Sequence, residues 1–288
     1  MLAALLFVLF AQGMPVQDTA NPLPDSNTFV REVRSHLRSD RLLLSQYAYN
    51  LKQTEIEYDK KGRPKKTTVR VYEVYPSLDE GFTYERLISK DGVAVTPKEL
   101  EKQDNAYDRK VKEHARKLQR EGSTERDYRT AKEAEELRKE EAIIDEIFQM
   151  YDITMVGREN LDGRPAIQLT FQPRKDYKPK SREAGFLVKM AGKAWIGEED
   201  HQLIRLQVGL IDTLSIGLGV LARLNKGATL SFERRRVNDE IWLPGEARFA
   251  GTARVLLLKG LRIESISEFS EYRKFSVSSS ATRPVPKK

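Results

Sequence analysis

Residues 203–243 decide the fold, and their sequence is LIRLQVGLIDTLSIGLGVLARLNKGATLSFERRRVNDEIWL. Apolar and polar residues alternate on both sides of a turn-forming Asn-Lys-Gly, as expected of half-buried antiparallel strands. The pattern continues through residues 152–276, where short turn signals separate the segments: Asp162-Gly163, Glu199-Asp200, Asn225-Lys226-Gly227, Asn238-Asp239 and Lys259-Gly260. This region predicts an antiparallel meander that forms one large curved sheet.

The residues before this region predict one helix and a first set of strands. Phe29, Val33 and Leu37 fall on one face of an amphipathic helix near residues 26–37, for which Asp25 or Ser26 is the candidate N-cap. Three further alternating segments predict strands, with turns at Lys61-Gly62 and Asp91-Gly92: residues 47–51, 69–73 and 82–88.

Residues 97–150 have a different composition from the rest of the chain. They contain almost no Gly or Pro, are dense in Lys, Glu and Arg, and break once at Glu121-Gly122-Ser123. This pattern predicts two charged helices, of which the second gains an apolar face only near its end, at Leu137, Ile144, Phe148 and Tyr151. We therefore expect the far ends of both helices to project from the body as a polar hairpin. We also expect a short linker to replace residues 98–138 without loss of the sheet.

The N-terminus resembles a secretory signal peptide. The apolar run Leu2–Phe10 is followed by the small-residue stretch Ala11-Gln12-Gly13, although no basic residue precedes the run. We interpret residues 1–13 as a signal peptide and residues 14–25 as a linker, which predicts a periplasmic or, second, an extracellular location. The alternative is a buried N-terminal helix or strand. No second apolar run is long enough to span a bilayer, so we expect no transmembrane span in the mature chain.

Composition excludes several kinds of site. The chain has no cysteine, which excludes disulfides, thiolate metal ligands, a cysteine nucleophile and the lipid anchor of a bacterial lipoprotein. Charged residues make up 32% of the chain and the formal net charge is +7. The basic residues gather locally in the loop at residues 174–182, which we interpret as a solvated loop rather than a nucleic-acid or anionic-lipid site.

No catalytic or metal-binding motif accompanies the strands. The acids and imidazole of Glu198–His201 are consecutive, so they cannot all face one ion, and acidic turns are common. The three histidines lie in separate segments, which disfavours a catalytic triad. Residues Gly217–Ala222 match G-x-G-x-x-A, but a strand-like segment follows after a few residues, so the strand–helix context of a dinucleotide site is missing. We expect a non-enzyme without metal or cofactor.

The segment Leu210–Leu224 breaks the alternation because it is apolar almost throughout. Three interpretations remain open: a buried strand with a helical turn that fills the core, a flap over a hydrophobic cavity, or an exposed loop that touches a membrane or an acyl chain. The candidate ligand-binding residues of a hydrophobic groove all come from this segment: Leu210, Leu214, Ile216, Leu218 and Leu221.

Three short motifs carry a resemblance to a known superfamily: GKAWI at residues 192–196, DHQLIRL at 200–206 and NDEIWLPGEARF at 238–249. With the signal-like start and the N-terminal helix, they resemble the periplasmic lipoprotein-carrier superfamily, which includes the outer-membrane lipoprotein carriers and related sigma-factor regulators. The resemblance implies an unclosed β-barrel with helices that form a lid over an apolar cavity. It transfers no individual ligand residue.

Together these observations predict an α+β fold: a half-barrel meander with an N-terminal helix and a charged helical hairpin. We expect one domain over residues 26–276, with the helical insertion at about 97–150 and a disordered tail at 277–288. The predicted function is an exported envelope protein that holds an acyl chain, a lipidated protein or a hydrophobic peptide in an apolar groove. The alternative is an envelope scaffold that binds a protein partner through the hairpin, and a third possibility is a hydrolase.

Overall fold

The computed structural model describes residues 22–37, 44–77, 82–216, 222–255 and 260–274. The predicted signal peptide, most of the linker and the predicted C-terminal tail lie outside the described residues. Four helices are described: α1 Ser26–His36, α3 Pro97–Arg120, α4 Ser123–Met150 and α5 Arg182–Leu187. The strands are β1 Tyr47–Tyr58, β2 Pro64–Tyr75, β3 Tyr84–Lys90, β4 Val93–Ala94, β5 Tyr151–Leu161, β6 Arg164–Pro173, β7 Met190–Gly197, β8 Leu203–Leu210, β9 Leu214–Ile216, β10 Ala222–Leu224, β11 Thr229–Val237, β12 Ile241–Val255 and β13 Leu261–Lys274.

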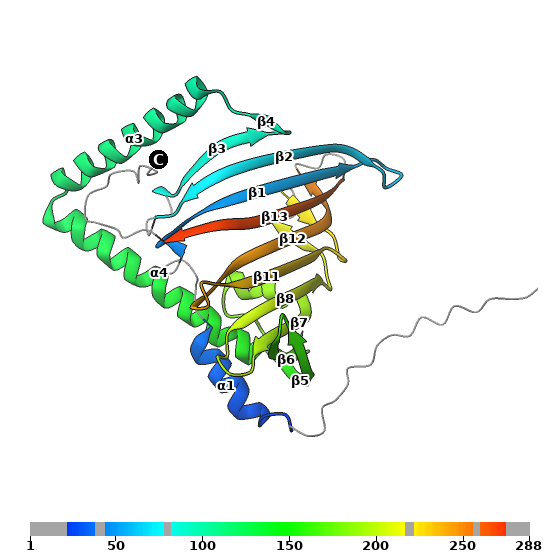
Figure 1. Ribbon diagram of the computed structural model, residues 1–288. Coiled ribbons are helices and arrows are strands. Elements are labelled where there is room, and N and C mark those ends of the chain that lie inside the picture. The colour runs from blue at the N-terminus through cyan, green and yellow to red at the C-terminus, as the bar shows by residue number, and fades with distance from the viewer. Residues whose placement is uncertain (1–21, 38–43, 78–81, 217–221, 256–259, 275–288) are drawn as a thin grey trace, which may run out of the picture.

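The strands form one open antiparallel sheet of 13 strands, as the sequence predicts (Figure 1). Its main path runs β4-β3-β2-β1-β13-β12-β11-β8-β7-β6-β5, and the small strands β9 and β10 branch off β12. Most neighbours follow each other along the chain, but β1 pairs with the last strand, β13. The α+β class, the meander, the N-terminal helix and the two charged helices are confirmed.

Tight turns join β1 to β2, β3 to β4, β5 to β6, β7 to β8 and β11 to β12, each at a site that a turn signal predicts. Lys259 of the Lys259-Gly260 signal lies outside the described residues. Asp91 and Gly92 have φ values of 51° and 82°, and Asp162 and Gly163 have the same values. Positive φ at two central residues is the mark of a two-residue hairpin turn whose twist matches that of the strands, and glycine adopts it without strain.

The sheet has one apolar and one polar face, which follow from its register. Directly opposed residues of neighbouring antiparallel strands point to the same side. On one side such pairs connect Phe171, Gly192, Val208, Leu230 and Phe249 from β6 to β12, and beside them Leu169, Ala194, Leu206, Phe232 and Ala247. We call this side the apolar face.

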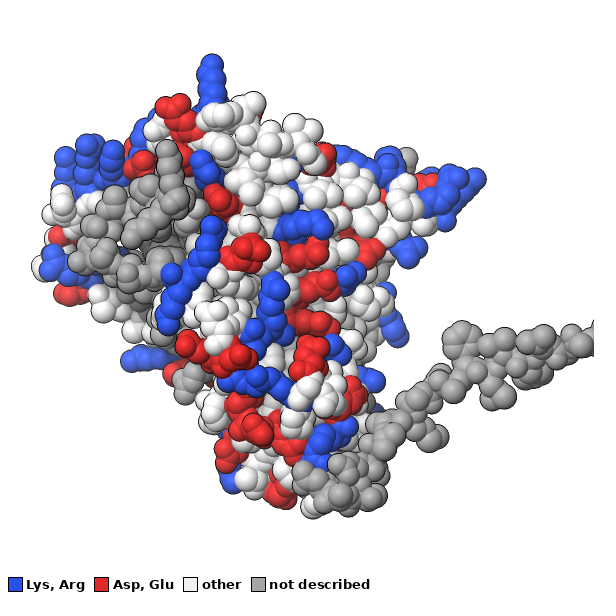
Figure 2. All heavy atoms as spheres, in the orientation of Figure 1, with Lys and Arg blue, Asp and Glu red and all other residues white. Residues whose placement is uncertain are grey.

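On the other side, called the polar face, a second row crosses the sheet: Trp195, Arg205, Glu233, Glu246, Glu268 and Lys52. Arg205 pairs with Glu233 at 2.6 Å and Lys52 with Glu268 at 2.8 Å. Figure 2 shows interleaved basic and acidic side chains in a band across the middle of the molecule. Such exposed pairs contribute little stability each, but they keep this face soluble.

The largest core cluster lies on the apolar face at the β5–β8 end, where α1 covers the sheet. Phe29 and Val33 of α1 are buried against Ile167, Leu169 and Ile196. Asp25 caps α1 by accepting a hydrogen bond from the Thr28 amide at 2.9 Å. The predicted helix and its apolar stripe are therefore confirmed, with Asp25 as the N-cap.

One residue of the predicted alternation packs differently. Leu206 packs in the cluster under α1, but Ile204 is buried with Ala166 and Trp195 in a separate cluster. The cause is a register shift between β7 and β8 at Trp195/Ile196, because a bulge moves the following side chains to the other face.

The helical hairpin α3–α4 connects the two edges of the sheet. The chain leaves edge strand β4, runs along α3, turns at the far corner of the molecule and returns along α4 to the opposite edge strand, β5 (Figure 1). At 1.5 Å per residue, the two helices are about 36 and 42 Å long. An open sheet separates its edges widely, so the connection between them has to be long.

The first turns of α3 are packed against β3, although the sequence shows no periodic apolar face there. Asp104 is 8% exposed and accepts hydrogen bonds from the Tyr84 hydroxyl at 2.6 Å and from Arg86 Nε at 3.0 Å. Tyr107 stacks on Tyr84 with ring centroids 4.3 Å apart. The composition concealed this contact because it is made by polar and aromatic groups rather than by an apolar stripe.

Gln103 shields the backbone of edge strand β3. Its side-chain oxygen accepts a hydrogen bond from the Leu87 amide at 2.9 Å, and its side-chain nitrogen donates one to the Leu87 carbonyl at 3.1 Å. The unpaired backbone groups of an edge strand can pair with another chain. The Gln103 amide occupies the Leu87 backbone groups at a position that the two-residue β4 does not reach.

Candidate functional site

The middle of the apolar face is not fully covered by the described helices. Five side chains on three neighbouring strands, β8, β11 and β12, form what we call the apolar track: Leu206, Val208, Leu230, Phe232 and Phe249. Leu230 is 41% exposed, and the other four are partly buried. A contiguous, partly exposed apolar surface on a sheet is a candidate binding surface.

Two of the five sequence-predicted site residues lie at one end of this track. Leu210 and Leu214 are 5% and 8% exposed and pack with Ala228 in a small cluster, to which Phe249 of the track also belongs. Ile216 lies in β9, where its backbone is opposite Ala222 of β10. Leu218 and Leu221 lie outside the described residues. The groove assignment of these five residues therefore stays a prediction.

The segment between β8 and β11 forms a small hairpin in its described part. Strands β9 and β10 pair antiparallel with each other, and β10 also pairs with the end of β12. Residues 217–221 lie outside the described residues, so the three interpretations of the segment stay open. The G-x-G-x-x-A match at Gly217–Ala222 is thus flanked by antiparallel strands, a context that differs from a dinucleotide site.

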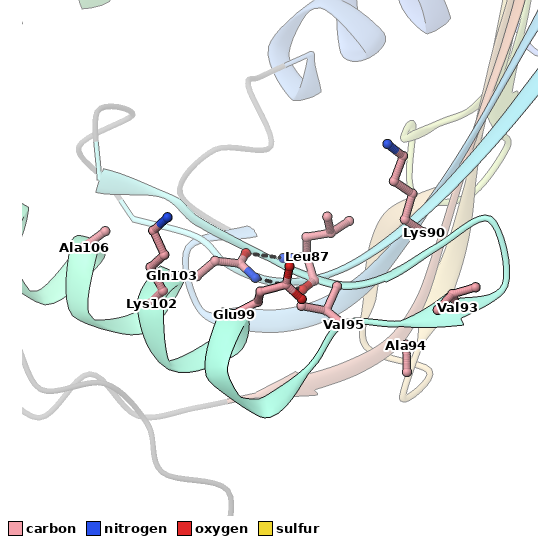
Figure 3. A pocket seen from close by; sticks show the side chains of 9 residues that line it. All are labelled: Leu87, Lys90, Val93, Ala94, Val95, Glu99, Lys102, Gln103 and Ala106. Carbon is pink, nitrogen blue, oxygen red and sulfur yellow. Dashed lines mark hydrogen bonds between the residues drawn. The ribbon is translucent and has the colours of Figure 1, made fainter.

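A hollow of about 620 Å³ lies between α3 and the β3–β4 hairpin (Figure 3). Its apolar lining comes from both sides: Leu87, Val93, Ala94, Val95 and Ala106. Four polar residues complete it: Lys90, Glu99, Lys102 and Gln103. Glu99 is engaged locally, because its carboxylate accepts hydrogen bonds from the Thr96 hydroxyl at 2.7 Å and the Thr96 amide at 3.2 Å.

A shallower hollow of about 450 Å³ lies over β7, β8 and β11 to β13. Most of its lining residues belong to rows of the polar face, among them Lys193, Gln207, Ser231, Arg248 and Glu264. Small residues, Gly209 and Ala250, leave space between these longer side chains. Arg248 is paired with Glu246.

The acidic turn at residues 198–201 has structural partners. Asp200 accepts hydrogen bonds from the Trp242 indole at 2.7 Å and from the Gln202 amide at 3.1 Å. Glu198 accepts a hydrogen bond from Arg158 Nε at 2.6 Å. These acids hold the β7–β8 turn against β5 and β12. In the described part of the chain, no group of three or more His, Asp or Glu side chains is placed to hold a metal ion.

Sequence reasoning missed both the track and the hollow under α3 as sites. The alternation of Leu206, Val208, Leu230 and Phe232 is visible in the sequence, but alternation by itself indicates only strand structure. The signal for the hollow was weaker: Val93 and Val95 follow a turn, and nothing in the sequence brings them to α3.

Among the described helices, none is long and apolar enough to cross a membrane.

Comparison with known proteins gives matches of structure only. No protein-family model and no curated protein sequence matches the chain. Three solved structures are similar in arrangement. A putative outer membrane lipoprotein-sorting protein domain from Vibrio parahaemolyticus has 8% identity and a TM-score of 0.34, and the match covers 89% of this chain and 93% of that one.

A DUF1329 family protein from Desulfovibrio piger has 12% identity and a TM-score of 0.27, with 88% and 92% of the two chains covered. A chain of the Pseudomonas aeruginosa MucA/MucB complex has 9% identity and a TM-score of 0.24, with 88% and 100% covered. At these identities and scores the similarity concerns the general arrangement and transfers no activity. The sheet is open, as the resemblance to the lipoprotein-carrier superfamily implied.

Proposed function

We propose that this chain is an exported binding protein of the cell envelope that holds an acyl chain, or the apolar part of a lipidated or hydrophobic polypeptide, against its apolar face. One observation carries the proposal: five apolar side chains lie side by side on β8, β11 and β12 and are partly exposed on the face of the sheet against which α1 packs. The apolar run at residues 2–10 supports export.

The binding mechanism is burial of apolar area. Removing apolar surface from water contributes about 25 cal/mol per Å², so a ligand that buries about 300 Å² gains roughly 7 kcal/mol. The loss of translational and rotational freedom on association offsets much of this gain. A micromolar affinity therefore requires a ligand that follows most of the track, as an extended acyl chain does.

Paired substitutions test the proposal. Leu230→Glu places a charge in the track, whereas Val156→Glu places one on edge strand β5 at a site of matched exposure, 41% against 40%. We expect Leu230→Glu to weaken binding of a fluorescent fatty-acid probe at least tenfold and Val156→Glu to leave it unchanged. Both variants should keep the circular dichroism spectrum of the parent. Equal probe binding by the two variants would remove the track from the site.

Native mass spectrometry of the protein purified from envelope fractions supplies an independent test. A co-purified lipid or acylated peptide is expected in the parent and is expected to be depleted in Leu230→Glu. Protein that carries no ligand in either form, together with no probe binding, contradicts the proposal.

A second candidate function is an envelope scaffold that binds a protein partner through α3–α4. Two large side chains on α4 favour it, because Tyr128 is 74% exposed and Leu137 is 55% exposed. Aromatic and aliphatic anchors of this kind often carry interface energy. A photo-crosslinking residue at position 128, in cells, distinguishes the two functions: one discrete cross-linked protein supports the scaffold, whereas no cross-link leaves only the apolar-face proposal.

A further inference from the structure

The hollow between α3 and the β3–β4 hairpin is separate from the apolar track and belongs to a different part of the chain. Apolar groups contributed by β3, β4 and α3 line it, and its volume of about 620 Å³ lies within the range of small-molecule sites. Val93, in this lining, is 70% exposed. A ligand that covers an apolar side chain this exposed removes its surface from water, and this favours binding.

Two lysines give the hollow its charge. Figure 3 shows Lys90 and Lys102 on either side of Leu87, with both ammonium groups extended to the same side as the Leu87 side chain. Within the described part of the chain, neither ammonium group has an ion-pair or hydrogen-bond partner. The site thus presents an apolar centre flanked by two cations.

The nearby carboxylate of Glu99 offsets only one of the two positive charges, and it interacts electrostatically with Lys102. Glu99 is fixed at the start of α3, where its carboxylate accepts hydrogen bonds from the hydroxyl and the amide of Thr96. These hydrogen bonds hold the pKa of Glu99 below its ordinary value, so the group stays charged. The three side chains together leave one net positive charge, which favours an anionic ligand group.

The edge-strand geometry disfavours a polypeptide as the occupant. A peptide that joins a sheet edge needs a run of free backbone groups. Here β4 is only two residues long, and Gln103 already occupies the amide and the carbonyl of Leu87. A ligand in this hollow therefore binds through its own apolar chain and a charged end rather than through main-chain pairing.

We propose that the hollow under α3 binds a single-chain carboxylate amphiphile, such as a fatty acid. Its chain lies against Leu87, Val95 and Ala106, and its carboxylate meets the positive charge that Lys90 and Lys102 give the rim of the hollow. This site goes beyond the proposed function, because it is remote from the apolar track in the sheet order and recognises a charged head group.

Three probes with the same tail test the chemistry: dodecanoate, dodecanol and dodecyltrimethylammonium, each below its critical micelle concentration. Isothermal titration calorimetry of the full chain should show that dodecanoate binds at least tenfold more tightly than dodecanol and that the cationic probe does not bind. Methyl signals of Val93 and Val95 in NMR spectra should shift with dodecanoate. Equal affinity for all three probes overturns the proposal.

Matched substitutions locate the head group. Lys90→Gln with Lys102→Gln should weaken dodecanoate binding at least tenfold and leave dodecanol binding unchanged. Lys98→Gln with Lys112→Gln, on exposed lysines of the same helix outside the hollow, should change neither. All four substitutions lie on the surface, so the thermal unfolding midpoint checks that the fold is intact.

Leu230→Glu separates this site from the apolar track. If dodecanoate still binds to Leu230→Glu but not to the Lys90→Gln, Lys102→Gln double variant, the hollow is the site, whether or not the apolar track also binds a ligand. If binding is lost with Leu230→Glu and survives the lysine pair, the ligand lies on the track and the proposal for the hollow is wrong.

Discussion

Single side chains with several partners fix the places where helices meet the sheet. Asp104 joins α3 to β3 by accepting hydrogen bonds from Tyr84 and Arg86. Arg86 also donates a hydrogen bond to Glu73 at 3.1 Å. The Arg86 guanidinium and the Asp104 carboxylate are largely removed from water, so each charge is stabilised by the other. Such a group is costly to remove because its partner stays behind unpaired.

Asp104→Asn is expected to lower the free energy of unfolding by about 2–3 kcal/mol, because Arg86 loses the charged half of its pairing. Chemical denaturation measures the change, and hydrogen exchange at the Leu87 amide should rise with it as α3 loosens from β3. Glu101→Gln, an exposed position on α3, is the control and should change stability by less than about 0.5 kcal/mol. Equal effects of both substitutions contradict the argument.

Glu146 of α4 holds the loop before α5. It is 6% exposed and accepts hydrogen bonds from the Lys180 amide at 2.6 Å, the Ser181 hydroxyl at 3.0 Å and the Tyr177 hydroxyl at 3.0 Å. Burial by itself raises the pKa of this carboxyl, but the hydrogen bonds outweigh burial, and the pKa lies below its ordinary value of 4.5.

This lowered pKa predicts a pH-dependent effect of Glu146→Gln. The carboxylate stabilises the fold above about pH 4.5, and that contribution is lost as the pH falls through the lower native pKa. At pH 7 the variant should be less stable by about 1–3 kcal/mol, and the difference should shrink below pH 4.5. Urea unfolding at pH 7 and pH 3.5 measures both values. A difference that is the same at the two pH values would rule out this role for the carboxylate.

At the scale of elements, the α3–α4 hairpin has two parts with different roles. Its inner ends pack on β3 and on α1, α5 and β5, while its outer turns reach away from the sheet (Figure 1). Lys110 and His114 still lie near Phe82, at 5.0 Å and 4.2 Å from its ring. The packed part of α3 therefore extends to about residue 114.

Replacing Arg116–Arg129 by an eight-residue Gly/Ser linker should leave the fold intact. The trimmed residues make few contacts with the sheet, and the change in loop length costs less than about 1 kcal/mol. Thermal unfolding should shift by only a few degrees. Replacing residues 98–138 also removes Gln103, Asp104 and Tyr107 and should lower the midpoint much further. If the short replacement abolishes cooperative unfolding, the outer turns have a structural role that their exposure does not suggest.

At the scale of the whole molecule, an open sheet without disulfides has to be stabilised by its core alone. The chain has no cysteine, and its buried residues gather in several clusters rather than in one centre. In the described part of the chain, this arrangement leaves the middle of the apolar face only partly covered, which is the physical basis of the proposed binding function.

Export is a prediction for the whole molecule as well. N-terminal sequencing of the mature protein from its native host should begin near Met14, because the apolar run ends before Ala11-Gln12-Gly13. Osmotic-shock fractionation should release this form with periplasmic markers. Intact Met1 in a cytosolic fraction contradicts export and leaves the binding surfaces to be tested separately.

The sequence by itself determined the local structure. Period-two alternation and the Asp-Gly and Asn-Asp turns predict hairpins, because both depend on neighbouring residues. The apolar stripe of Phe29 and Val33 predicts α1, and the lack of Gly and Pro from residue 97 predicts the long charged helices. Each of these features is set within one element or between two adjacent ones.

Only the tertiary structure decided what meets across long separations. The pairing of β1 with β13 places residues 47–58 beside residues 261–274, and no turn signal encodes it. The same is true of Gln103 on the Leu87 backbone and of the α3–α4 hairpin as the connection between the two sheet edges. Leu87, Lys90 and Lys102 form one hollow because α3 closes on an edge strand, a contact between polar groups that leaves no periodic apolar signal in the sequence.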